Sequence, residues 1–482
     1  MCTYRVSDSE AFSRSDKMGR VLVPTLRTIV LCGLWALLSF IVLGCGSGES
    51  SRKLEAASQD KPNIIFVLTD DMHKDEFSRI EGLRALAAEG VTFENAFVTN
   101  PECCPSRVTD LTGKYSHNHG VLTNEGSLHG GYDAYRKRGV GRSTVATWLQ
   151  EAGYRTGLFG KFLNGYGSKD EPNGFDAYVR TNSPADDPAL GAEAADFIEN
   201  NYEKGPLFIA LWVKSPHTPL EVNWRFRQTH HGETFEQPPS FNEKDVSDKA
   251  GWVRVLPPFN AIEKAHFMEA REKRLRMLEG ANFALRKTLG ALQSVGEREN
   301  TYIVFTSDNG FMLGEHRLAF LKTVPYEEST HVPLVITGPD VPQGKVRDEL
   351  VANNDLAPTM AEWAGVDAPS VDGRSLTPLL SDEAVSWRNA LLTENPGGMT
   401  GRYGRVPGHA ALVTRSFVYI EWRTGERELY DLREDPHETR NIYSTADTAT
   451  VESLEDRLAA LEMCSGKGCR DAEDTPASKR VR

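Results

Sequence analysis

The chain reads Pro101-Glu102-Cys103-Cys104-Pro105-Ser106-Arg107 and continues through Leu111-Thr112-Gly113-Lys114. A cysteine pair stands here beside a turn-forming proline, and a polar, basic run follows at once. By residue type alone, Cys103 is a candidate nucleophile, metal ligand or half of a disulfide. A bond between Cys103 and Cys104 is disfavoured, because neighbouring side chains point apart and the closed loop would be strained. What the pair does therefore depends on what the rest of the chain places beside it.

Length and composition bound the class of protein. The 482 residues exceed one typical core and leave room for a large domain and a smaller one. Hydrophobic residues make up 39% and charged residues 26%, which is ordinary for a soluble globular protein. The formal net charge of -13 argues against nucleic acid as a partner. Such a chain also repels anions at long range, so any anion site must be built locally from basic side chains or a cation.

The first 45 residues resemble a targeting segment. Basic residues precede an apolar run from Ile29 to Leu43, which is too short for a comfortable membrane span. The run ends in Val42-Leu43-Gly44-Cys45-Gly46, which resembles the lipobox of bacterial lipoproteins, with Cys45 as the lipid-bearing residue. A plain signal peptide and an uncleaved anchor are the alternatives. Residues 46–61 are rich in Gly, Ser and charge and are predicted to form a flexible tether. We expect an exported protein of the bacterial cell envelope, lipid-anchored or secreted.

Four short apolar runs are predicted to be buried parallel strands: 63–69, 154–160, 207–213 and 301–306. Polar residues follow each of them. Because the carboxyl ends of parallel strands share one edge of a sheet, where ligands bind, these side chains are expected to meet. In chain order they are Asp70 and Asp71, Lys161, His217, and Asp308 with Asn309.

The acidic members of this group predict a cation site. Two carboxylates at the end of a buried strand pack poorly and ligate hard cations well, although a solvated turn is the alternative. Asp308 and Asn309 complete an all-oxygen set with Asp70 and Asp71. Oxygen ligands suit Ca²⁺ or Mg²⁺ and not zinc.

Other segments carry weaker indications. His117 and His119 are interpreted as structural or substrate-rim residues, and the loop Cys464-Ser-Gly-Lys-Gly-Cys469 as able to close in a disulfide. Residues 224–258 lack periodicity and are predicted to form a lid or rim, where substrate choice usually lies. Residues 261–290 predict a long amphipathic helix acting as a solvent-facing cover.

The pattern Cys-x-Pro-Ser-Arg-x-x-x-Leu-Thr-Gly-Lys at 103–114 resembles the signature of the type I, formylglycine-dependent sulfatases of the alkaline-phosphatase superfamily. Further elements match that family: Pro-His-x-Pro at 216–219, Gly-Glu-His at 314–316 and Lys-x-x-x-Tyr-Glu at 322–327. The forms at 114–119 and 161–164 resemble the N-acetylglucosamine-6-sulfatase branch. Many sulfatases carry a histidine where this chain has Leu163, so that role is absent here. The resemblance spans about residues 62–440.

The resemblance implies an α/β fold, with a large mainly parallel sheet flanked by helices, as in alkaline phosphatase, and a smaller C-terminal α+β subdomain. We place the catalytic domain at 62–375 and the subdomain at 376–482.

The resemblance also implies a chemistry. A formylglycine-generating enzyme would oxidise Cys103 to formylglycine, whose hydrated aldehyde attacks sulfur in a sulfated carbohydrate or an aryl sulfate. One divalent cation, Ca²⁺ with Mg²⁺ as the alternative, would be bound by Asp70, Asp71, Asp308, Asn309 and the modified Cys103. Arg107 and Lys114 would support the hydrate. Lys161, His217 and Lys322 would bind the sulfate, and His217 or Lys322 would protonate the leaving alcohol.

Three other readings stay open at this point. A phosphonate monoester hydrolase or phosphodiesterase of the same superfamily would share the metal residues. A non-catalytic, surface glycan-binding lipoprotein would have lost metal or nucleophile residues, all of which are present. A redox or zinc protein built on Cys103 and Cys104 lacks partner His or Cys spacing.

Overall fold

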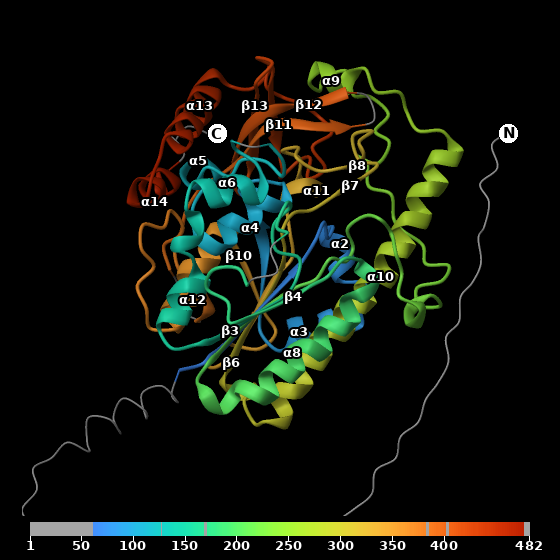
Figure 1. Cartoon of the computed structure of the whole chain (residues 1–482). Helices are drawn as coiled ribbons and strands as arrows, with labels where there is room; N and C mark the ends of the chain where they lie inside the picture. Colours follow the sequence, from blue (N-terminus) through green and yellow to red (C-terminus); the bar gives the residue numbers. More distant parts are fainter. Residues whose placement is uncertain (1–60, 127, 168–170, 382–384, 402–403, 477–482) are drawn as a thin grey trace, which may run out of the picture. The chain divides into compact units, whose positions relative to one another are not determined.

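The structure is a computed structural model that describes residues 61–126, 128–167, 171–381, 385–401 and 404–476 (Figure 1). The predicted signal peptide, the lipid site at Cys45 and nearly all of the tether lie outside the described residues. A search of the helices in these ranges for a membrane span, by length and apolar character, finds none.

An eight-stranded sheet is the centre of the fold, with the strand order β10-β2-β9-β6-β1-β5-β3-β4. Every neighbouring pair is parallel except those made by β9, which runs against both β2 and β6. The predicted mainly parallel sheet is confirmed. The strands are β1 (Asn63–Thr69), β2 (Val91–Phe97), β3 (Arg155–Gly160), β4 (Ala177–Arg180), β5 (Leu207–Trp212), β6 (Thr301–Ser307), β9 (Leu334–Thr337) and β10 (Lys345–Ala352).

The continuous apolar runs form central strands because both faces of the sheet are covered. In β1 all seven residues are buried, and successive side chains enter opposite layers. Ile64 and Phe66 pack in one core with helices α4 (Cys103–Thr112), α7 (Val145–Glu151) and α12 (Leu356–Trp363). Ile65 and Val67 pack in the other core with α3 (Glu81–Ala88), α8 (Asp187–Asn201) and α10 (Ala261–Ser294). The central strands are therefore fixed from both sides, which positions their carboxyl ends.

A second, antiparallel sheet lies in the C-terminal part, with the order β11-β12-β13-β14. Its strands are β11 (Leu391–Gly401), β12 (Gly404–Val413), β13 (Phe417–Trp422) and β14 (Arg427–Asp431). Helices α13 (Thr448–Glu462) and α14 (Lys467–Asp474) follow, and Leu454 and Leu458 of α13 pack on the sheet. The sheet and helices agree with the predicted α+β region, whereas the boundary at residue 376 stays a prediction.

Helix α10 differs from its predicted role. It begins with a capping box in which Asn260 and Glu263 each bond the other's backbone amide. The helix carries Arg271 and Arg274 into the interior, where they are 4% and 1% exposed. Both are tolerated there because each pairs with a buried glutamate. The interpretation of this segment as only a solvent-facing cover was wrong.

The remaining elements are short and lie mostly in the connections. The predicted rim segment 224–258 contains one 3₁₀ turn and one helical turn. The elements are α2 (Lys74–Phe77), α5 (Ser116–His119), α6 (Gly131–Lys137), α9 (Gly251–Arg254), α11 (Glu327–Thr330), β7 (Met312–Leu313), β8 (Ala319–Leu321) and the 3₁₀ turns Val140–Arg142, Pro184–Asp186, Tyr202–Lys204, Trp224–Phe226, Arg298–Asn300, Asn353–Asp355 and Thr377–Leu380.

Candidate active site

Four neighbouring parallel strands, β6, β1, β5 and β3, end at the same edge of the large sheet. The residues that follow them are those expected from the sequence, and hydrogen bonds and ion pairs join them to one another. The predicted convergence of these side chains is confirmed. Their individual roles are taken up below as proposals.

Three carboxylates form the acidic half of the site. Asp70, Asp71 and Asp308 are at most 1% exposed. The backbone N–H of Asp71 donates to Asp308 Oδ1 at 3.2 Å, and Asn309 Nδ2 donates to Asp71 Oδ1 at 2.7 Å. Asp71 has a φ of 69°, a left-handed conformation that is uncommon for a residue with a Cβ. Such backbone strain costs about 1–3 kcal/mol and gathers at functional sites.

Three basic side chains offset these charges. Lys161 Nζ donates to Asp70 Oδ2 at 2.5 Å, and Lys322 Nζ donates to the Asp71 carboxylate. Arg107 Nε donates to Asp308 Oδ2 at 2.8 Å. Burial by itself would raise the pKa of Asp70, but Lys161, His217, Arg107 and Lys322 together hold it well below its usual value. The buried site is therefore a compensated cluster of ions, which is what keeps so much charge stable in the interior.

Cys103 is the first residue of α4 and is completely buried. Its Sγ lies 3.2 Å from Asp70 Oδ1 and 2.7 Å from Lys322 Nζ. Burial, together with Asp308 and Asp70, raises the pKa of the thiol well above its usual value. The unmodified side chain is therefore a neutral thiol and a poor nucleophile, because the thiolate is the reactive form. Cys103 also stands at the N-terminus of α4, whose backbone amides oppose the effect of the carboxylates without overcoming it.

His217 is held beside the carboxylates by the loop after β5. The carboxylate of Asp187 accepts the backbone N–H groups of Lys214 and Ser215 at 3.0 and 2.8 Å, which anchors this loop to α8. His217 Nε2 lies 3.7 Å from Asp71 Oδ2, and its side chain is 26% exposed. It is thus the accessible member of the cluster.

The donor set fits a hard divalent cation. Asn309 Oδ1 is buried and has no hydrogen-bond partner among the described residues, whereas its Nδ2 is satisfied. A buried acceptor without a donor is costly unless a cation or water meets it. Asp70, Asp71 and Asp308 supply further oxygens within the same buried site, and oxygen ligands favour Ca²⁺ or Mg²⁺. The residues present therefore fit the predicted ion.

Lys114 lies apart from the other predicted residues. Cys103 begins α4, whereas Lys114 follows Gly113, the left-handed residue that ends the helix. Ten residues of helix span about 15 Å. No hydrogen bond or ion pair of the described residues joins Lys114 to Cys103 or Arg107. The structure thus leaves Lys114 at the far end of the helix, and a supporting role there stays a prediction.

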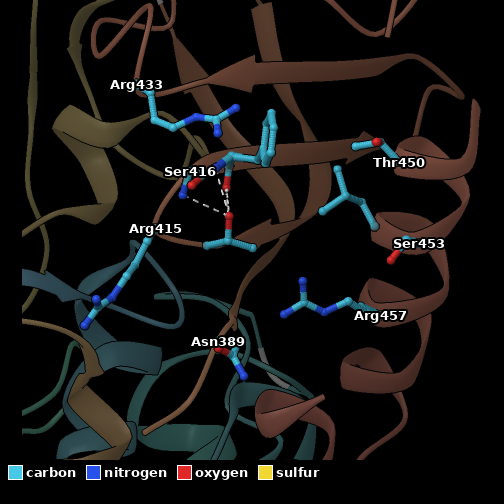
Figure 2. Close-up of a pocket in the computed structure, with 10 residues that line it drawn as sticks. Asn389, Arg415, Ser416, Arg433, Thr450, Ser453 and Arg457 are labelled. Atoms are coloured by element: carbon cyan, nitrogen blue, oxygen red, sulfur yellow. Dashed lines mark hydrogen bonds between the residues drawn. The ribbon is translucent and has the colours of Figure 1, made fainter. Parts of the chain in front are cut away.

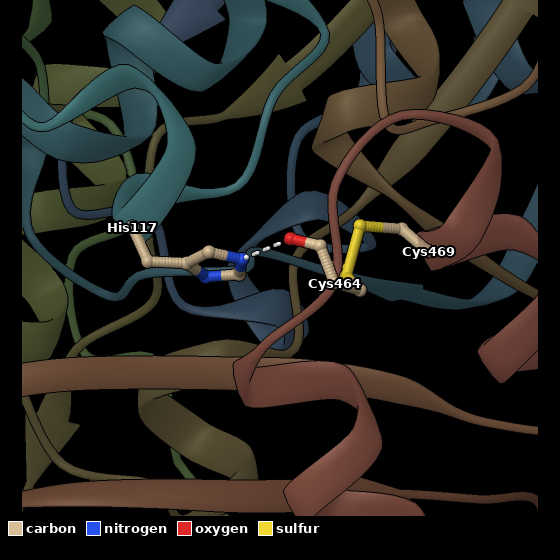
Figure 3. Close-up of side chains that lie close together, drawn as sticks. All are labelled: His117, Cys464 and Cys469. Carbon is tan, nitrogen blue, oxygen red and sulfur yellow. Dashed lines mark hydrogen bonds between the residues drawn. A yellow bond between two sulfur atoms is a disulfide. The ribbon is translucent and has the colours of Figure 1, made fainter.

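His117 has a structural environment, as expected (Figure 3). Its Nδ1 lies 2.8 Å from Glu394 Oε1, and its Nε2 lies 3.1 Å from the carbonyl oxygen of Cys464. Cys464 and Cys469 form a disulfide. Both sulfurs are therefore bonded to each other, and this group of three residues does not offer thiolate ligands to a metal.

Two residues beneath the site were not anticipated. Arg274 of α10 donates to the backbone carbonyl of Asp71 and, through Nε, to Glu76 Oε1 at 2.6 Å. The two side chains thus hold the strained turn that presents Asp71. A sequence signal exists, because Phe267, Arg271, Arg274 and Leu278 lie on one helical stripe. Charged residues within an apolar stripe indicate buried ion pairs, which the sequence reading of this helix overlooked.

A cavity of about 270 Å³ opens beside the cluster. Lys161 and His217, which contact the site carboxylates, also belong to its wall. The rest of its lining consists of Phe162, Leu163, Asn164, Gly165, Tyr166, Tyr178, Arg180, Thr181, Asn182 and Lys214. Of the twelve lining residues, four are basic or histidine, namely Lys161, Arg180, Lys214 and His217, and none is acidic, in a chain whose net charge is -13. The cavity therefore favours an anionic ligand placed against the carboxylate cluster.

Comparison with known families decides the class of the protein. The Sulfatase family model matches residues 62–366. This stretch contains all the predicted site residues, from Asp70 to Lys322. The chain belongs to the sulfatase family. A second model, N-sulphoglucosamine sulphohydrolase C-terminal, matches residues 314–463. This sulfatase is accordingly a sulfuric ester hydrolase.

Several curated sulfatases are similar to this one in sequence. The human N-acetylglucosamine-6-sulfatase is 28% identical over 482 aligned residues, covering 86% of this chain and 87% of its own. The N-acetylglucosamine-6-O-sulfatase of Bacteroides thetaiotaomicron is 27% identical and is covered to 88%. The Drosophila melanogaster extracellular sulfatase SULF-1 homolog is 32% identical over 72% of this chain, which spans only 34% of that longer protein.

Solved structures agree with the fold. One structure, of a protein in complex with its substrate D-glucosamine-2-N,6-O-disulfate, has a TM-score of 0.71 at 24% identity and covers 87% of this chain and all of the other. The phosphonate monoester hydrolase of Agrobacterium radiobacter has a TM-score of 0.66 at 21% identity, covering 83% of this chain and 95% of the other. At these identities the likeness shows the architecture, and the sequence matches carry the family.

Proposed function

We propose that this sulfatase removes the 6-O-sulfate from a glucosamine or N-acetylglucosamine residue of a sulfated glycan. The observation that carries the proposal is the wall shared by the cavity and the carboxylate cluster. Lys161 and His217 belong to both, so a sugar in the cavity would place a sulfate ester against Cys103 and the cation ligands. The aligned relatives support the choice of sugar, since two of them are N-acetylglucosamine-6-sulfatases matched over nearly their whole length.

The charge of the cavity supports recognition of a sulfated sugar over a neutral one. Arg180 and Lys214 stand in the same wall as Lys161 and His217, and Lys214 Nζ donates to the carbonyl of Asn182 at 2.9 Å. Asn164, Asn182 and Thr181 add amide and hydroxyl groups that suit sugar hydroxyls. Basic residues for the sulfate and neutral polar groups for the ring are the composition expected of such a site.

The proposal includes two groups that the family uses. Formylglycine at Cys103 would supply, as its hydrate, the hydroxyl that attacks sulfur, and a bound Ca²⁺, or Mg²⁺, would favour ionisation of that hydroxyl. Asp70, Asp71, Asp308 and Asn309 would hold the cation. Asn309 Oδ1, which is buried and has no partner in the part of the chain that the structure describes, supports this assignment most directly.

Basic side chains of the site would position the carboxylates and the sulfate, and one of them would protonate the leaving alcohol. Arg107 fixes Asp308 and Asp70, whose carboxylates it reaches at 2.8 and 3.4 Å. Lys322 is 4% exposed at its side chain and contacts Asp71 and Cys103, so its charge serves the sulfate and the nucleophile position. His217 faces the cavity, so we assign the proton for the leaving alcohol to His217 and not to Lys322.

The proposal extends to location. The chain would be exported and held at a bacterial cell surface through a lipid on Cys45, after a formylglycine-generating enzyme has modified Cys103. The lipobox-like end of the apolar run supports the anchor. The disulfide between Cys464 and Cys469 supports an oxidising compartment. Radiolabelled palmitate incorporation in the wild type and in Cys45→Ala tests the anchor, and equal labelling would refute it.

The decisive experiment has a chemical and a kinetic part. The tryptic peptide Ala85–Arg107, from protein made with a maturing enzyme, is expected to carry an aldehyde at Cys103 that forms a hydrazide adduct. The protein is then assayed on N-acetylglucosamine-6-sulfate, its 3-sulfate and 4-sulfate isomers, and a phosphonate monoester. Preference for the 6-sulfate by kcat/KM supports the proposal. Preference for another isomer or for the phosphonate contradicts it, as does an unmodified thiol when a control substrate is matured.

A further inference from the structure

A second cavity, of about 290 Å³, lies in the C-terminal region between helix α13 and the turn that joins β12 to β13 (Figure 2). It shares no lining residue with the cavity beside Cys103. Three of its lining residues are arginines, and no acidic residue lines it among the described part of the chain. The full lining is Asn389, Thr414, Arg415, Ser416, Phe417, Arg433, Thr450, Ser453, Leu454 and Arg457. This sulfatase thus has a second locally basic cavity despite its net charge of -13.

Arg457 is the unusual member of this lining. The residue is only 5% exposed, yet its Nε and one terminal nitrogen, Nη2, are buried without a hydrogen-bond partner in the described ranges of the chain. No carboxylate of the described residues forms an ion pair with it. Burial without a counter-charge lowers the pKa of the Arg457 guanidinium. A buried charge normally persists only when it is paired and hydrogen-bonded. An anion would supply the partner that the Arg457 guanidinium lacks among the described residues.

The other two arginines already have partners, which distinguishes them from Arg457. Arg433 pairs with Asp431 at 2.7 Å and lies over the ring of Phe417. Arg415 pairs with Asp348 at 3.3 Å, and both side chains are about half exposed or more. They add positive potential to the cavity, whereas Nε and Nη2 of Arg457 are donors that no other described residue uses.

Neutral donors line the same cavity as the guanidinium. Thr450 and Ser453 precede Arg457 by seven and four residues, so they share its face of α13. Figure 2 shows Arg457 reaching from the helix toward the cavity, with Ser416 on the opposite strand turn. A guanidinium fork recognises an oxyanion through charge-assisted hydrogen bonds, and hydroxyl groups in the same cavity are further donors for it.

We propose that this cavity is a second oxyanion site that binds a sulfate group through Arg457. The source would be a sulfate on a saccharide chain longer than the part held beside Cys103, and this choice rests on the proposed function. Free sulfate, the product of the reaction, has the same chemistry and is the alternative source. The oxyanion site itself does not depend on which sugar the enzyme hydrolyses.

Calorimetric titration of the full chain tests the site without turnover. The protein carries Cys103→Ala, and the probes are sodium sulfate and a heparin-derived hexasaccharide. Adding Arg457→Leu is expected to weaken binding at the Arg457 cavity by about 10-fold or more, because charge-assisted hydrogen bonds are lost. Binding at the cavity beside Cys103 is expected to stay the same. Loss with the hexasaccharide assigns the site to a saccharide sulfate. Loss with sodium sulfate alone supports the oxyanion site and overturns its saccharide assignment.

Matched controls separate this effect from general charge and from misfolding. Arg423→Leu removes an arginine that pairs with Glu462 of the same helix but does not line the cavity. It is expected to bind both probes as the parent does. Leucine at 457 removes an unpaired buried charge, so the melting temperature in sulfate-free buffer should not fall. Crystals soaked in selenate should show anomalous scattering at the guanidinium of Arg457. Unchanged affinity for both probes in Arg457→Leu, or no selenate there, would overturn the proposal.

Discussion

Lys322 Nζ lies 2.7 Å from Cys103 Sγ, although 219 residues separate them in the chain. The same amine donates to the carboxylate of Asp71. The Lys322 amine thus joins Cys103, the first residue of α4, to the carboxylate that follows β1. This contact ties the segment after β8 to α4, so one side chain links two parts of the candidate active site.

Replacing Lys322 is expected to impair the chemical step. In Lys322→Met the sulfate loses a buried positive charge, and kcat should fall by about 100-fold or more. The amount of formylglycine at Cys103 is measured by mass spectrometry in the same sample, so that failed maturation is recognised. Lys467→Met, on a side chain that is 77% exposed, is the control and should keep full activity. A mature Lys322→Met enzyme with normal kcat would contradict the role.

Because His217 lines the cavity, we predict that the effect of replacing it depends on the leaving group of the substrate. In His217→Ala, turnover of a sugar sulfate, whose alcohol needs a proton, should fall by about 100-fold or more. Turnover of 4-nitrocatechol sulfate should fall much less, because its leaving group departs without a proton. The comparison of kcat for the two substrates checks this. Equal losses on both would exclude His217 as the proton donor.

The sequence predicted the residues of the candidate site better than the buried ion pairs that hold them in place. Continuous apolar runs followed by Asp70, Lys161 or Asp308 indicate both a buried strand and the place where it ends. Their adjacency follows from the rule that parallel strands share an edge. Arg274 and Glu76 meet across 198 residues, and no local pattern pairs them. Such tertiary ion pairs depend on how α10 lies against the loop after β1.

The C-terminal part shows a different limit. The run Ala410 to Val413 marks β12 plainly, whereas β11 contains Pro396, Gly397 and Gly398, which weaken any strand pattern. Pairing with β12 and a register shift after Gly397 accommodate them. The sequence also does not indicate that Arg457 is buried, because an arginine on an amphipathic helix is expected to face solvent.

Removal of the cation should affect stability as well as activity. Asp70, Asp71 and Asp308 are buried together, so a divalent ion that binds only the folded state stabilises it, and the stabilisation grows with the logarithm of the free ion concentration above the dissociation constant. Treatment with EDTA should abolish turnover and lower the melting temperature. Calcium should restore both at a lower concentration than zinc, because the ligands are oxygens. Asn309→Ala should require more calcium for half-maximal activity. A melting temperature insensitive to EDTA and calcium would contradict the site.

The pair of Arg274 and Glu76 predicts a large stability effect. Arg274→Met removes the guanidinium that donates to the buried Glu76 carboxylate and to the carbonyl of Asp71. Glu76 is left with only the backbone N–H of His73 among the described donors. Breaking one side of a buried ion pair costs about 3–5 kcal/mol. Urea unfolding should therefore show a lower midpoint, and Arg274→Met combined with Glu76→Gln should recover part of the loss. A double variant as unstable as the sum of the two single variants would show that the residues do not act as a pair.

His409 predicts how stability changes with pH. It is 1% exposed, and neither ring nitrogen has a hydrogen-bond partner in the described structure. Burial, with a smaller effect of Arg423, lowers the pKa of His409 to about 3. The unfolded chain takes up this proton below about pH 6.5, whereas the folded chain does so only near pH 3. The contribution of His409 to the free energy of unfolding is therefore fully present above pH 6.5 and is lost as the pH falls toward 3.

The variant His409→Leu isolates that contribution, since leucine keeps an apolar side chain in the core and does not titrate. When the pH is lowered from 7 to 5, the unfolding free energy of the wild type should fall by about 2 kcal/mol more than that of the variant. Urea unfolding at the two pH values measures it. His231→Leu, at a side chain that is 76% exposed, should leave the pH dependence as it is in the wild type. If the wild type and His409→Leu lost stability in parallel over this range, His409 would have to find a partner or solvent in the folded protein, and its assignment as a neutral, unpaired core histidine would be wrong.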